Sequence, residues 1–266
     1  NGQDWFYHFQ DVDAGGRLVH LQPMKWEKDW PVMGIDTDKN GIGEPVLTHK
    51  KPEVGKIFPI ETPAESDEFN DDKIGLQWQW SANENVVWSA KIPGKDYLRL
   101  FSIKVPEGEK NLWNVPNLLT QKFPAPNFVA TTKVKLFPED AKQGKVAGLL
   151  VMGTDHASLV ITNKPDGYYL QLRKAPKAEK GGEEKILNEI KLKSNEAYLK
   201  VDVKEPNGIC TFSYSENGKK FENIGDTFQA KPGKWIGAKV GIYSVSDPKV
   251  SRGGYADFDF FRITKK

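Results

Sequence analysis

Hydrophobic and polar residues alternate with a period of two along most of the chain after about residue 67. The alternation is present in three segments, 76–80, 168–172 and 197–203. Asn-Gly and Asp-Gly turn sequences recur at 165–167, 206–208 and 216–218. Residues 146–152 form a continuous apolar run around one glycine, which indicates a strand buried on both faces. Only 183–193 is ambiguous with a helix, so we predict an all-β sandwich of two sheets and about 200 residues.

The first thirty residues carry a different pattern, which is rich in aromatic side chains. Residues 5–9 (WFYHF) predict a strand, 13–16 (DAGG) a turn, and 17–24 a returning strand. Two antiparallel strands alone are marginally stable in water, so this hairpin is expected to belong to a larger sheet. No strand of a matching sheet precedes it, and the chain lacks an initiator Met. We therefore expect the hairpin to close a domain whose earlier part is not in this sequence.

Residues 31–66 show little periodicity and contain many prolines and glycines. This composition is typical of an ordered connector between two domains. A second irregular segment, 175–184 (APKAEKGGEE), is rich in charged residues, and we expect it to be a flexible loop.

The composition of the chain excludes several classes of binding partner. The 266 residues have a formal net charge of +2, with acidic and basic side chains interspersed. This distribution provides no electrostatic footprint for nucleic acid or an anionic membrane surface, so we expect neither as a partner. The sequence has no run of about 18 apolar residues that could form a membrane span. The one cysteine, Cys210, excludes a disulfide within the chain.

Several ordered motifs carry a resemblance to a known family. Near the start, the motifs that resemble the closing blade of glycoside hydrolase family 43 enzymes are WFYHFQD (5–11), GRLVHLQPMKW (16–26) and WPVMG (30–34). Those enzymes are five-bladed β-propellers that act on the side chains and ends of xylan and arabinan. Four later motifs resemble the C-terminal sandwich of the β-xylosidase and arabinofuranosidase members, namely QWQWSAN (77–83), NLLTQKFP (117–124), GLLVMG (148–153) and GGYADFDFFRI (253–263).

The resemblance implies a division of the all-β chain into three parts. Residues 1–34 would form the last, incomplete blade of a five-bladed β-propeller. Residues 35–66 would form the connector, and residues 67–266 a C-terminal concanavalin A-like β-sandwich of the jelly-roll type.

The chemistry implied by the resemblance is hydrolysis without a cofactor. Two carboxylates flank the scissile bond of the sugar and act with inversion, and a third orients the acid. In the family these carboxylates lie in earlier blades, and Asp4, Asp11 and Asp13 match none of their motifs. We therefore expect no catalytic residue in this chain, which would be the C-terminal portion of a hydrolase that removes xylosyl or arabinofuranosyl units. The expected partners are xylan- or arabinoxylan-type saccharides and the remaining propeller blades.

Three residues are candidates for contact with the sugar. The resemblance implies that His8 points to the propeller axis, near a water or calcium ion, a position that suits a neutral imidazole. It implies that Arg17 reaches the terminal sugar, where a guanidinium can donate to neighbouring hydroxyls. Trp113 lies in the polar loop 107–116, and with Leu112 it is a candidate for a wall that the sandwich adds to the pocket. The alternatives are a core histidine at position 8 and a surface salt bridge at Arg17.

The segment that starts at Asp36 is a candidate calcium loop. Asp36, Asp38 and Asn40 reproduce the opening of an EF-hand loop, D-x-D-x-N-G, and Glu44 could add an oxygen at the ninth position. The bidentate glutamate of the twelfth position is absent, because Leu47 stands there. A polar turn capped by Asx side chains is the alternative interpretation.

A second candidate calcium site combines Glu68, near the first sandwich strand, with Asp257, near the last. The resemblance to concanavalin-like modules implies a structural calcium where such strands meet, and Asp259 is an alternate ligand. Two unrelated surface carboxylates are the alternative.

The tryptophans of the sandwich leave a second class of function open. Those that could stack on sugars are Trp78, Trp80, Trp88, Trp113 and Trp235. At alternating positions of a β-rich domain such residues are more often core, and only Trp113 is excepted here. A carbohydrate-binding module that holds polysaccharide on the sandwich itself, and a structural domain that supports the propeller, are the two other functions. These motifs do not separate xylose from arabinose specificity.

Overall fold

The structure is a computed structural model that describes residues 2–139, 144–247 and 253–266. Nearly all regular structure in these residues is β, with two short 3-10 helices, η1 (Asp13–Gly15) and η2 (Ala178–Lys180). Within the described residues, neither helix has the length or the apolar character needed to cross a membrane. The prediction of an all-β chain is therefore confirmed.

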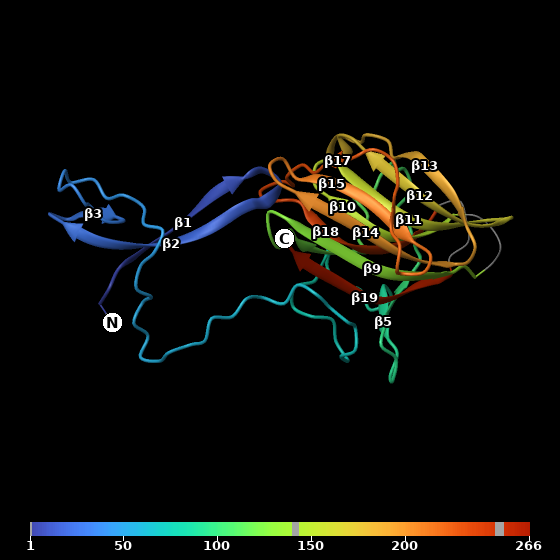
Figure 1. The fold of residues 1–266 in the computed structure, drawn as a ribbon, viewed down its shortest axis with the longest axis horizontal. Helices are drawn as coiled ribbons and strands as arrows, with labels where there is room; N and C mark the ends of the chain where they lie inside the picture. Colours follow the sequence, from blue (N-terminus) through green and yellow to red (C-terminus); the bar gives the residue numbers. More distant parts are fainter. Residues whose placement is uncertain (1, 140–143, 248–252) are drawn as a thin grey trace. The chain divides into compact units, whose positions relative to one another are not determined.

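The chain divides into two compact units (Figure 1). Unit 1 comprises Asn1–Val12 and Arg17–Thr62. Unit 2 comprises Asp13–Gly16 and Pro63–Lys266. The short turn of the first hairpin thus groups with the large unit, whereas its neighbours on both sides group with the small one.

Unit 1 contains one three-stranded sheet of β1 (Trp5–Val12), β2 (Gly16–Glu27) and β3 (Trp30–Met33), in that order. Lys28 and Asp29 connect β2 to β3 with φ of 50° and 63°, the left-handed pair that a tight hairpin turn requires. The predicted aromatic hairpin is confirmed, and β3 extends it by one strand.

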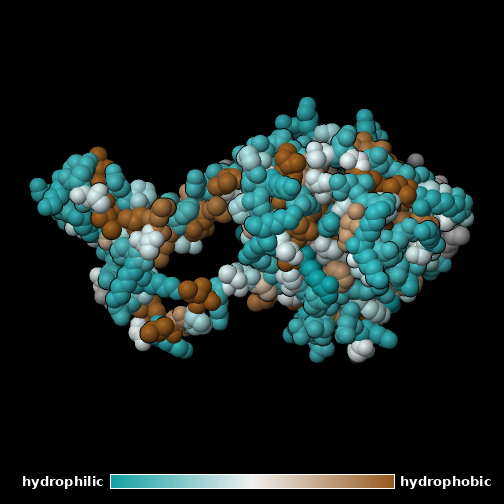
Figure 2. Space-filling view, viewed as in Figure 1, coloured by the Kyte–Doolittle hydropathy of each residue, from teal (hydrophilic) through white to brown (hydrophobic). Residues whose placement is uncertain are grey.

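The strands of unit 1 leave large apolar side chains exposed (Figure 2). Tyr7 and Trp30 are 72% and 73% exposed. The other exposed apolar residues on these strands include Phe9, Leu18, Val19, Leu21 and Trp26. A surface of this kind is typical of a contact region.

The connector first returns along β2 and then loses regular structure. The side chain of Gln22 accepts a hydrogen bond from the Val46 N–H (2.8 Å) and donates one to the Val46 carbonyl (3.2 Å). Ile35 and Glu44 form an isolated antiparallel bridge. No helix or strand is present in residues 47–62, all of which the structure describes.

Unit 2 is a sandwich of two eight-stranded sheets. The first sheet has the order β13-β12-β11-β10-β18-β8-β4, with β7 paired to β18, and the second has the order β16-β15-β14-β9-β19-β6-β5, with β17 paired to β15. Their bounds are β4 (Gln79–Trp80), β5 (Ser89–Lys91), β6 (Leu98–Phe101), β7 (Ile103–Lys104), β8 (Leu118–Lys122), β9 (Phe128–Phe137), β10 (Lys145–Met152), β11 (His156–Lys164), β12 (Gly167–Ala175), β13 (Lys185–Leu192), β14 (Glu196–Lys204), β15 (Ile209–Ser215), β16 (Glu222–Asn223), β17 (Phe228–Gln229), β18 (Lys239–Ser246) and β19 (Tyr255–Lys265).

The main core of unit 2 lies between the two sheets and follows the alternation in the sequence. In β9 every second side chain, from Phe128 to Leu136, is buried, and the intervening ones are half-buried. Trp78 and Trp88 join the core as predicted, each 7% exposed. β10 is buried on both faces, as its apolar run predicted. Its Gly148 lies so close to β11 that a Cβ would be 2.2 Å from a main-chain carbonyl oxygen.

A second apolar cluster lies on the outer face of the first sheet. Its members are Leu112, Val115, Leu118, Val146, Leu150, Val160, Tyr243 and Val245. Two of them belong to the segment 105–117, which we call the Trp113 loop. This loop therefore covers part of the sheet face that points away from the main core.

The segment 175–184 packs against the sandwich, although its charges suggested a flexible loop. It contains η2, whose Ala178 is 1% exposed. The Glu184 side chain at its end is only 15% exposed. The ambiguous pattern that follows forms β13, the edge strand of the first sheet.

Candidate functional site

His8 lies in the middle of β1, inside a stack of rings. Its imidazole is 5.1 Å from the ring of Phe6, at 11°, and 5.1 Å from the ring of His20, at 25°. The Nε2 atom of His20 is buried and has no hydrogen-bond partner among the described residues. His8 is half-buried, so the stack fixes the plane of its ring without enclosing it.

Arg17 lies at the start of β2 and contacts the neighbouring strand. Its Nε is 3.6 Å from the carboxylate of Asp11, and its guanidinium carbon is 4.7 Å from the centre of the Phe9 ring. One third of the Arg17 side chain remains exposed (33%). The surface ion pair that we gave as the alternative is present, and the guanidinium is also stacked on an aromatic ring.

Trp113 and the segment 231–237, which we call the Trp235 loop, lie near each other in unit 2. Lys234 connects the two loops, because its Nζ is 5.9 Å from the centre of the Trp113 ring. The side chain of Trp235 is 78% exposed, and its φ of 65° is left-handed. The expectation that Trp235 is a core residue is wrong, because it stands in a Pro- and Gly-containing loop where strand alternation does not apply.

The Trp235 loop is fixed by a close backbone crossing with the turn of the first hairpin. The N–H of Ala238 donates to the carbonyl of Ala14 at 2.8 Å, and Ala14 is 1% exposed within the main core of the sandwich. A Cβ at Gly16 would lie 2.4 Å from the nitrogen of Gly237. The two glycines therefore allow the turn 13–16 to become part of unit 2, which the sequence did not reveal.

The Trp113 loop is held by hydrogen bonds just before the tryptophan. The Asn111 amide donates to the carbonyls of Ala178 (3.1 Å) and Gly182 (2.7 Å). The N–H of Leu112 donates to Nε2 of His156 at 3.1 Å. Since His156 is the first residue of β11, the position of the loop depends on a side chain of the first sheet.

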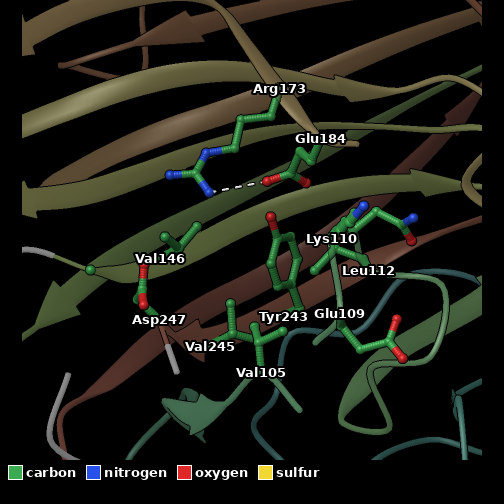
Figure 3. Close-up of a pocket in the computed structure, with 12 residues that line it drawn as sticks. Val105, Glu109, Lys110, Leu112, Val146, Arg173, Glu184, Tyr243, Val245 and Asp247 are labelled. Atoms are coloured by element: carbon green, nitrogen blue, oxygen red, sulfur yellow. Dashed lines mark hydrogen bonds and ion pairs between the residues drawn. The ribbon is translucent and has the colours of Figure 1, made fainter. Parts of the chain in front are cut away.

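Beneath this loop lies a cavity of about 190 Å³ with charged walls (Figure 3). Arg173 donates to Glu184 at 3.1 Å, and the hydroxyl of Tyr243 points toward that carboxylate from below. The Tyr243 hydroxyl donates to Ser158 at 3.1 Å. Burial raises the pKa of Glu184, partly offset by the charge of Arg173, and burial lowers the pKa of His156 to about 4. We did not predict this cluster, because Glu184 stands in a stretch of charges that looked solvated.

The candidate calcium loop is closed by its own hydrogen bonds. Asp36 accepts from the N–H groups of Asn40 (3.1 Å) and Gly41 (3.0 Å), and Asp38 accepts from the N–H and the side-chain amide of Asn40. These contacts are those of the polar-turn alternative. Each carboxylate oxygen keeps a second lone pair, but the described residues of this loop do not form a group of three ligands placed to hold a metal ion.

The second pair of candidate calcium ligands is divided between two arginines. Asp257, 7% exposed, accepts two hydrogen bonds from Arg99, at 2.8 and 2.9 Å. Glu68 accepts two from Arg262, at 2.7 and 2.8 Å. The alternate ligand Asp259 pairs with Lys133 at 2.8 Å. In the described part of the chain no group of three or more His, Cys, Asp or Glu residues is placed to hold a metal.

Fold and local geometry together define a two-sheet concanavalin A-like sandwich with an aromatic surface made by two loops. The sequence model of the family described as "Beta xylosidase C-terminal Concanavalin A-like domain" matches residues 66–264. The chain belongs to this family.

Two curated relatives match nearly all of the chain. One is a "Putative beta-xylosidase" from Xylanibacter ruminicola, 35% identical over 243 residues, which cover 91% of this chain and 42% of the relative. The other is a "Beta-xylosidase" from Formosa agariphila, 31% identical over 285 residues, which cover 97% of this chain and 45% of the relative. The chain thus spans less than half the length of the curated relatives it matches.

Solved structures agree with the fold. A bifunctional GH43-CE protein from Bacteroides eggerthii superposes with a TM-score of 0.78 at 25% identity, covering 100% of this chain and 33% of that one. A xylan beta-1,4-xylosidase from Bacillus halodurans superposes with a TM-score of 0.74 at 22% identity, covering 94% of this chain and 47% of that one. The predicted membership in glycoside hydrolase family 43 and the predicted sandwich are confirmed.

Proposed function

We propose that this chain is the C-terminal part of a glycoside hydrolase that cleaves xylosyl or arabinofuranosyl bonds of plant polysaccharides. The observation that carries the proposal is the 35% identity to the relative named "Putative beta-xylosidase" along 91% of the chain. Because the chain spans only 42% of that relative, we assign the two carboxylates of an inverting mechanism to the remaining part. Neither carboxylate step needs a cofactor.

In unit 1, the proposed contribution to sugar binding comes from Arg17 and His8. Asp11 and Phe9 contact the guanidinium of Arg17, whose side chain is 33% exposed, and a guanidinium is a planar fork of donors that suits neighbouring sugar hydroxyls. The stacked ring of His8 can accept or donate one hydrogen bond in a fixed direction. Both residues position a ligand, and neither needs to exchange a proton with it.

The exposed apolar side chains of unit 1 fit a protein partner. Tyr7 and Trp30 are nearly three-quarters exposed, and their neighbours on the strands are also apolar. A soluble chain seldom leaves such a surface uncovered. We propose that the remaining propeller blades of the longer protein cover it.

In unit 2, Trp113, Lys234 and Trp235 form the surface that we propose for saccharide contact. Aromatic rings pack against the apolar faces of sugar rings, and an ammonium group donates to the hydroxyls. The glycine crossing fixes the Trp235 loop, and Asn111 fixes the Trp113 loop. The surface is therefore formed before a ligand binds, which lowers the entropic cost of binding.

An activity assay tests the hydrolase proposal. The purified chain, free of longer species, and a longer protein that contains it are assayed with aryl xylosides and aryl arabinofuranosides. The longer protein is expected to turn over on the order of once per second or faster, and the chain alone not at all. Turnover by the chain alone would show that its own residues suffice and would overturn the division proposed here.

A carbohydrate-binding module without hydrolytic activity is the second candidate, and the exposure of Trp235 favours it. Affinity electrophoresis in gels containing xylan distinguishes the two. A module should be retarded as the isolated chain, and Trp235→Ala should abolish the retardation. Trp26→Ala, which removes another exposed tryptophan (57%) in unit 1, is the matched control. Unretarded migration of the wild-type chain excludes this candidate.

A further inference from the structure

The Trp113 loop is joined to β11 through a ring nitrogen that must be unprotonated. The N–H of Leu112 can only donate, so Nε2 of His156, at 3.1 Å, must accept. The neutral ring then carries its proton on Nδ1. His156 is completely buried (0% exposed), so water cannot take the place of the Leu112 N–H. The hydrogen bond therefore selects one of the two neutral tautomers.

The protonated nitrogen faces a carboxylate. Nδ1 of His156 is 3.8 Å from Oε2 of Glu184, which is too long for a hydrogen bond, and both atoms are otherwise unpartnered in the described residues. The other oxygen of Glu184 accepts from Arg173 of β12. From β18, the buried Tyr243 donates to Ser158, two residues after His156 in β11, and the carbonyl of Lys110 in the loop accepts from the N–H of Glu184 at 2.9 Å.

We propose that His156 is an acid-sensitive latch that positions Trp113. A proton taken from solvent onto Nε2 turns the acceptor of the Leu112 N–H into a donor. Two N–H groups then face each other, and the hydrogen bond that holds the main chain at Leu112 is lost. The bonds of Asn111, which include the one its side-chain oxygen accepts from the N–H of Trp113 at 2.7 Å, do not titrate, so the change is confined to the main chain at Leu112, next to Trp113.

The environment favours a closed latch at neutral pH. Burial without a bonded anion disfavours the imidazolium and lowers the pKa of His156 to about 4. Burial raises the pKa of Glu184, so on acidification this carboxyl is protonated before the ring and offers the imidazolium no counter-charge across the 3.8 Å gap. The charged ring therefore loses the Leu112 contact without gaining an anionic partner, which keeps the charged form rare at neutral pH.

The wild-type chain gives the first test without any substitution. Nitrogen-15 chemical shifts of the His156 ring at pH 7 should show the Nδ1–H tautomer, with Nε2 as the acceptor. The exchange protection of the Leu112 amide should fall at least tenfold as the pH is lowered through the titration of this ring, while amides of β10 keep theirs. An Nε2–H tautomer at pH 7, or Leu112 protection that does not follow the titration, would overturn the latch.

Two substitutions at His156 distinguish the effect of its hydrogen-bond acceptor from the effect of its protonation. His156→Gln keeps an oxygen acceptor near the position of Nε2 but cannot be protonated in this range, so Leu112 should stay protected in acid. His156→Leu removes the acceptor, so protection should be low at every pH. His49→Gln, at an exposed histidine of unit 1, is the matched control and should behave as wild type. If Gln and wild type lose Leu112 protection at the same pH, the latch is excluded.

The consequence for sugar binding rests on the proposed function and is measured separately. In the longer protein, His156→Leu and Trp113→Ala should raise KM several-fold with little change in kcat, and His156→Gln should restore KM. Leu112 exchange that follows His156 with no change in KM would contradict the role of Trp113 but leave the latch intact. Leu112 exchange that ignores His156 would contradict the latch itself.

Discussion

Gly16 and Gly237 cross so closely that neither position can hold a side chain. A Cβ on Gly16 would lie 2.4 Å from the nitrogen of Gly237, and a Cβ on Gly237 would lie 2.6 Å from the nitrogen of Gly16. Because the obstructing atoms belong to the main chain, no side-chain rotation relieves the clash. This crossing ties the turn of the first hairpin to the Trp235 loop within the sandwich unit.

Gly237→Ala is therefore expected to destabilise unit 2 by about 1–3 kcal/mol, the range for overpacking a filled site. The φ of Gly237 is not left-handed, so the effect isolates steric crowding from backbone strain. Urea unfolding of the purified chain measures it. Gly233→Ala in the same loop is the control, since its nearest obstruction is a side-chain atom, Cγ1 of Ile236, at 3.0 Å. Equal effects of the two substitutions would contradict the importance of the crossing.

The alternation of hydrophobic residues was sufficient to predict the sandwich. It places Trp78 and Trp88 in the core, and both are there. Such predictions succeed because a strand with one buried face shows it in neighbouring residues, within five or six positions. The family motifs extended the prediction to the concanavalin A-like architecture, which the comparisons confirm.

Of the three features that the sequence did not reveal, two depend on contacts between residues that are separated in the sequence, and the third depends on local backbone conformation. Ala14 enters the core because Ala238, more than two hundred positions later, donates to its carbonyl. Glu184 is buried because Arg173 and His156 surround it, and nothing in its charged neighbours indicates this. Trp235 is exposed because its backbone is left-handed in a loop, where a period-two pattern has no meaning.

The buried imidazole predicts a pH dependence of stability. Its pKa is about 4 in the folded chain and near 6.5 when unfolded, so between these values the unfolded chain binds more protons. Stability from His156 is therefore complete above pH 6.5 and declines toward pH 4, by about 3 kcal/mol in total. The contribution of Glu184 to the pH dependence of stability has the opposite sign. Because its pKa is raised in the folded chain, the folded state binds more protons than the unfolded state above pH 4.5.

Comparison with His156→Gln isolates the histidine, since Glu184 is present in both proteins. We expect wild type to lose about 3 kcal/mol relative to the variant between pH 7 and pH 4. Urea unfolding at several pH values, with the far-UV spectrum checked at each, provides the measurement. A relative change below about 1 kcal/mol would show that the imidazole is charged in the folded chain.

The two carboxylate–arginine pairs of the second sheet should contribute very differently to stability. Asp257 is 7% exposed and its partner Arg99 lies 3.6 Å from the centre of the Tyr255 ring. Asp257→Asn is expected to cost about 2–3 kcal/mol, because a guanidinium whose side chain is only 20% exposed loses its counter-charge. Glu68→Gln, in a pair whose side chains are about half exposed, should cost less than about 1 kcal/mol. Thermal unfolding compares them, and equal losses would contradict the burial argument.

Calcium is expected to have no effect on the stability of this chain. The carboxylates of the candidate loop accept N–H donors, and those of Glu68 and Asp257 accept guanidinium groups. An ion bound at a hundred times its Kd would stabilise the fold by about 2.7 kcal/mol, a readily measured shift in Tm. Unfolding curves with excess calcium and with excess EDTA should coincide. A higher Tm in calcium would show that one of the two predicted sites binds the ion. Asp38→Asn and Glu68→Gln would then identify which site it is.

Substitution of Arg17 tests the proposed contribution of unit 1 to sugar binding. In the longer protein, Arg17→Ala should lower kcat/KM by about 1.5–3 kcal/mol, the range for hydrogen bonds that involve a charged group. Arg17→Lys should recover only part of this loss, because an ammonium group lacks the planar fork that donates to two neighbouring hydroxyls. The matched control is Lys25→Ala, which removes another cation from β2 together with its 2.5 Å ion pair to Glu27. That control should leave kcat/KM unchanged. If Arg17→Ala keeps the native Tm and an unchanged kcat/KM, Arg17 does not contact the sugar and its role is limited to the surface ion pair with Asp11.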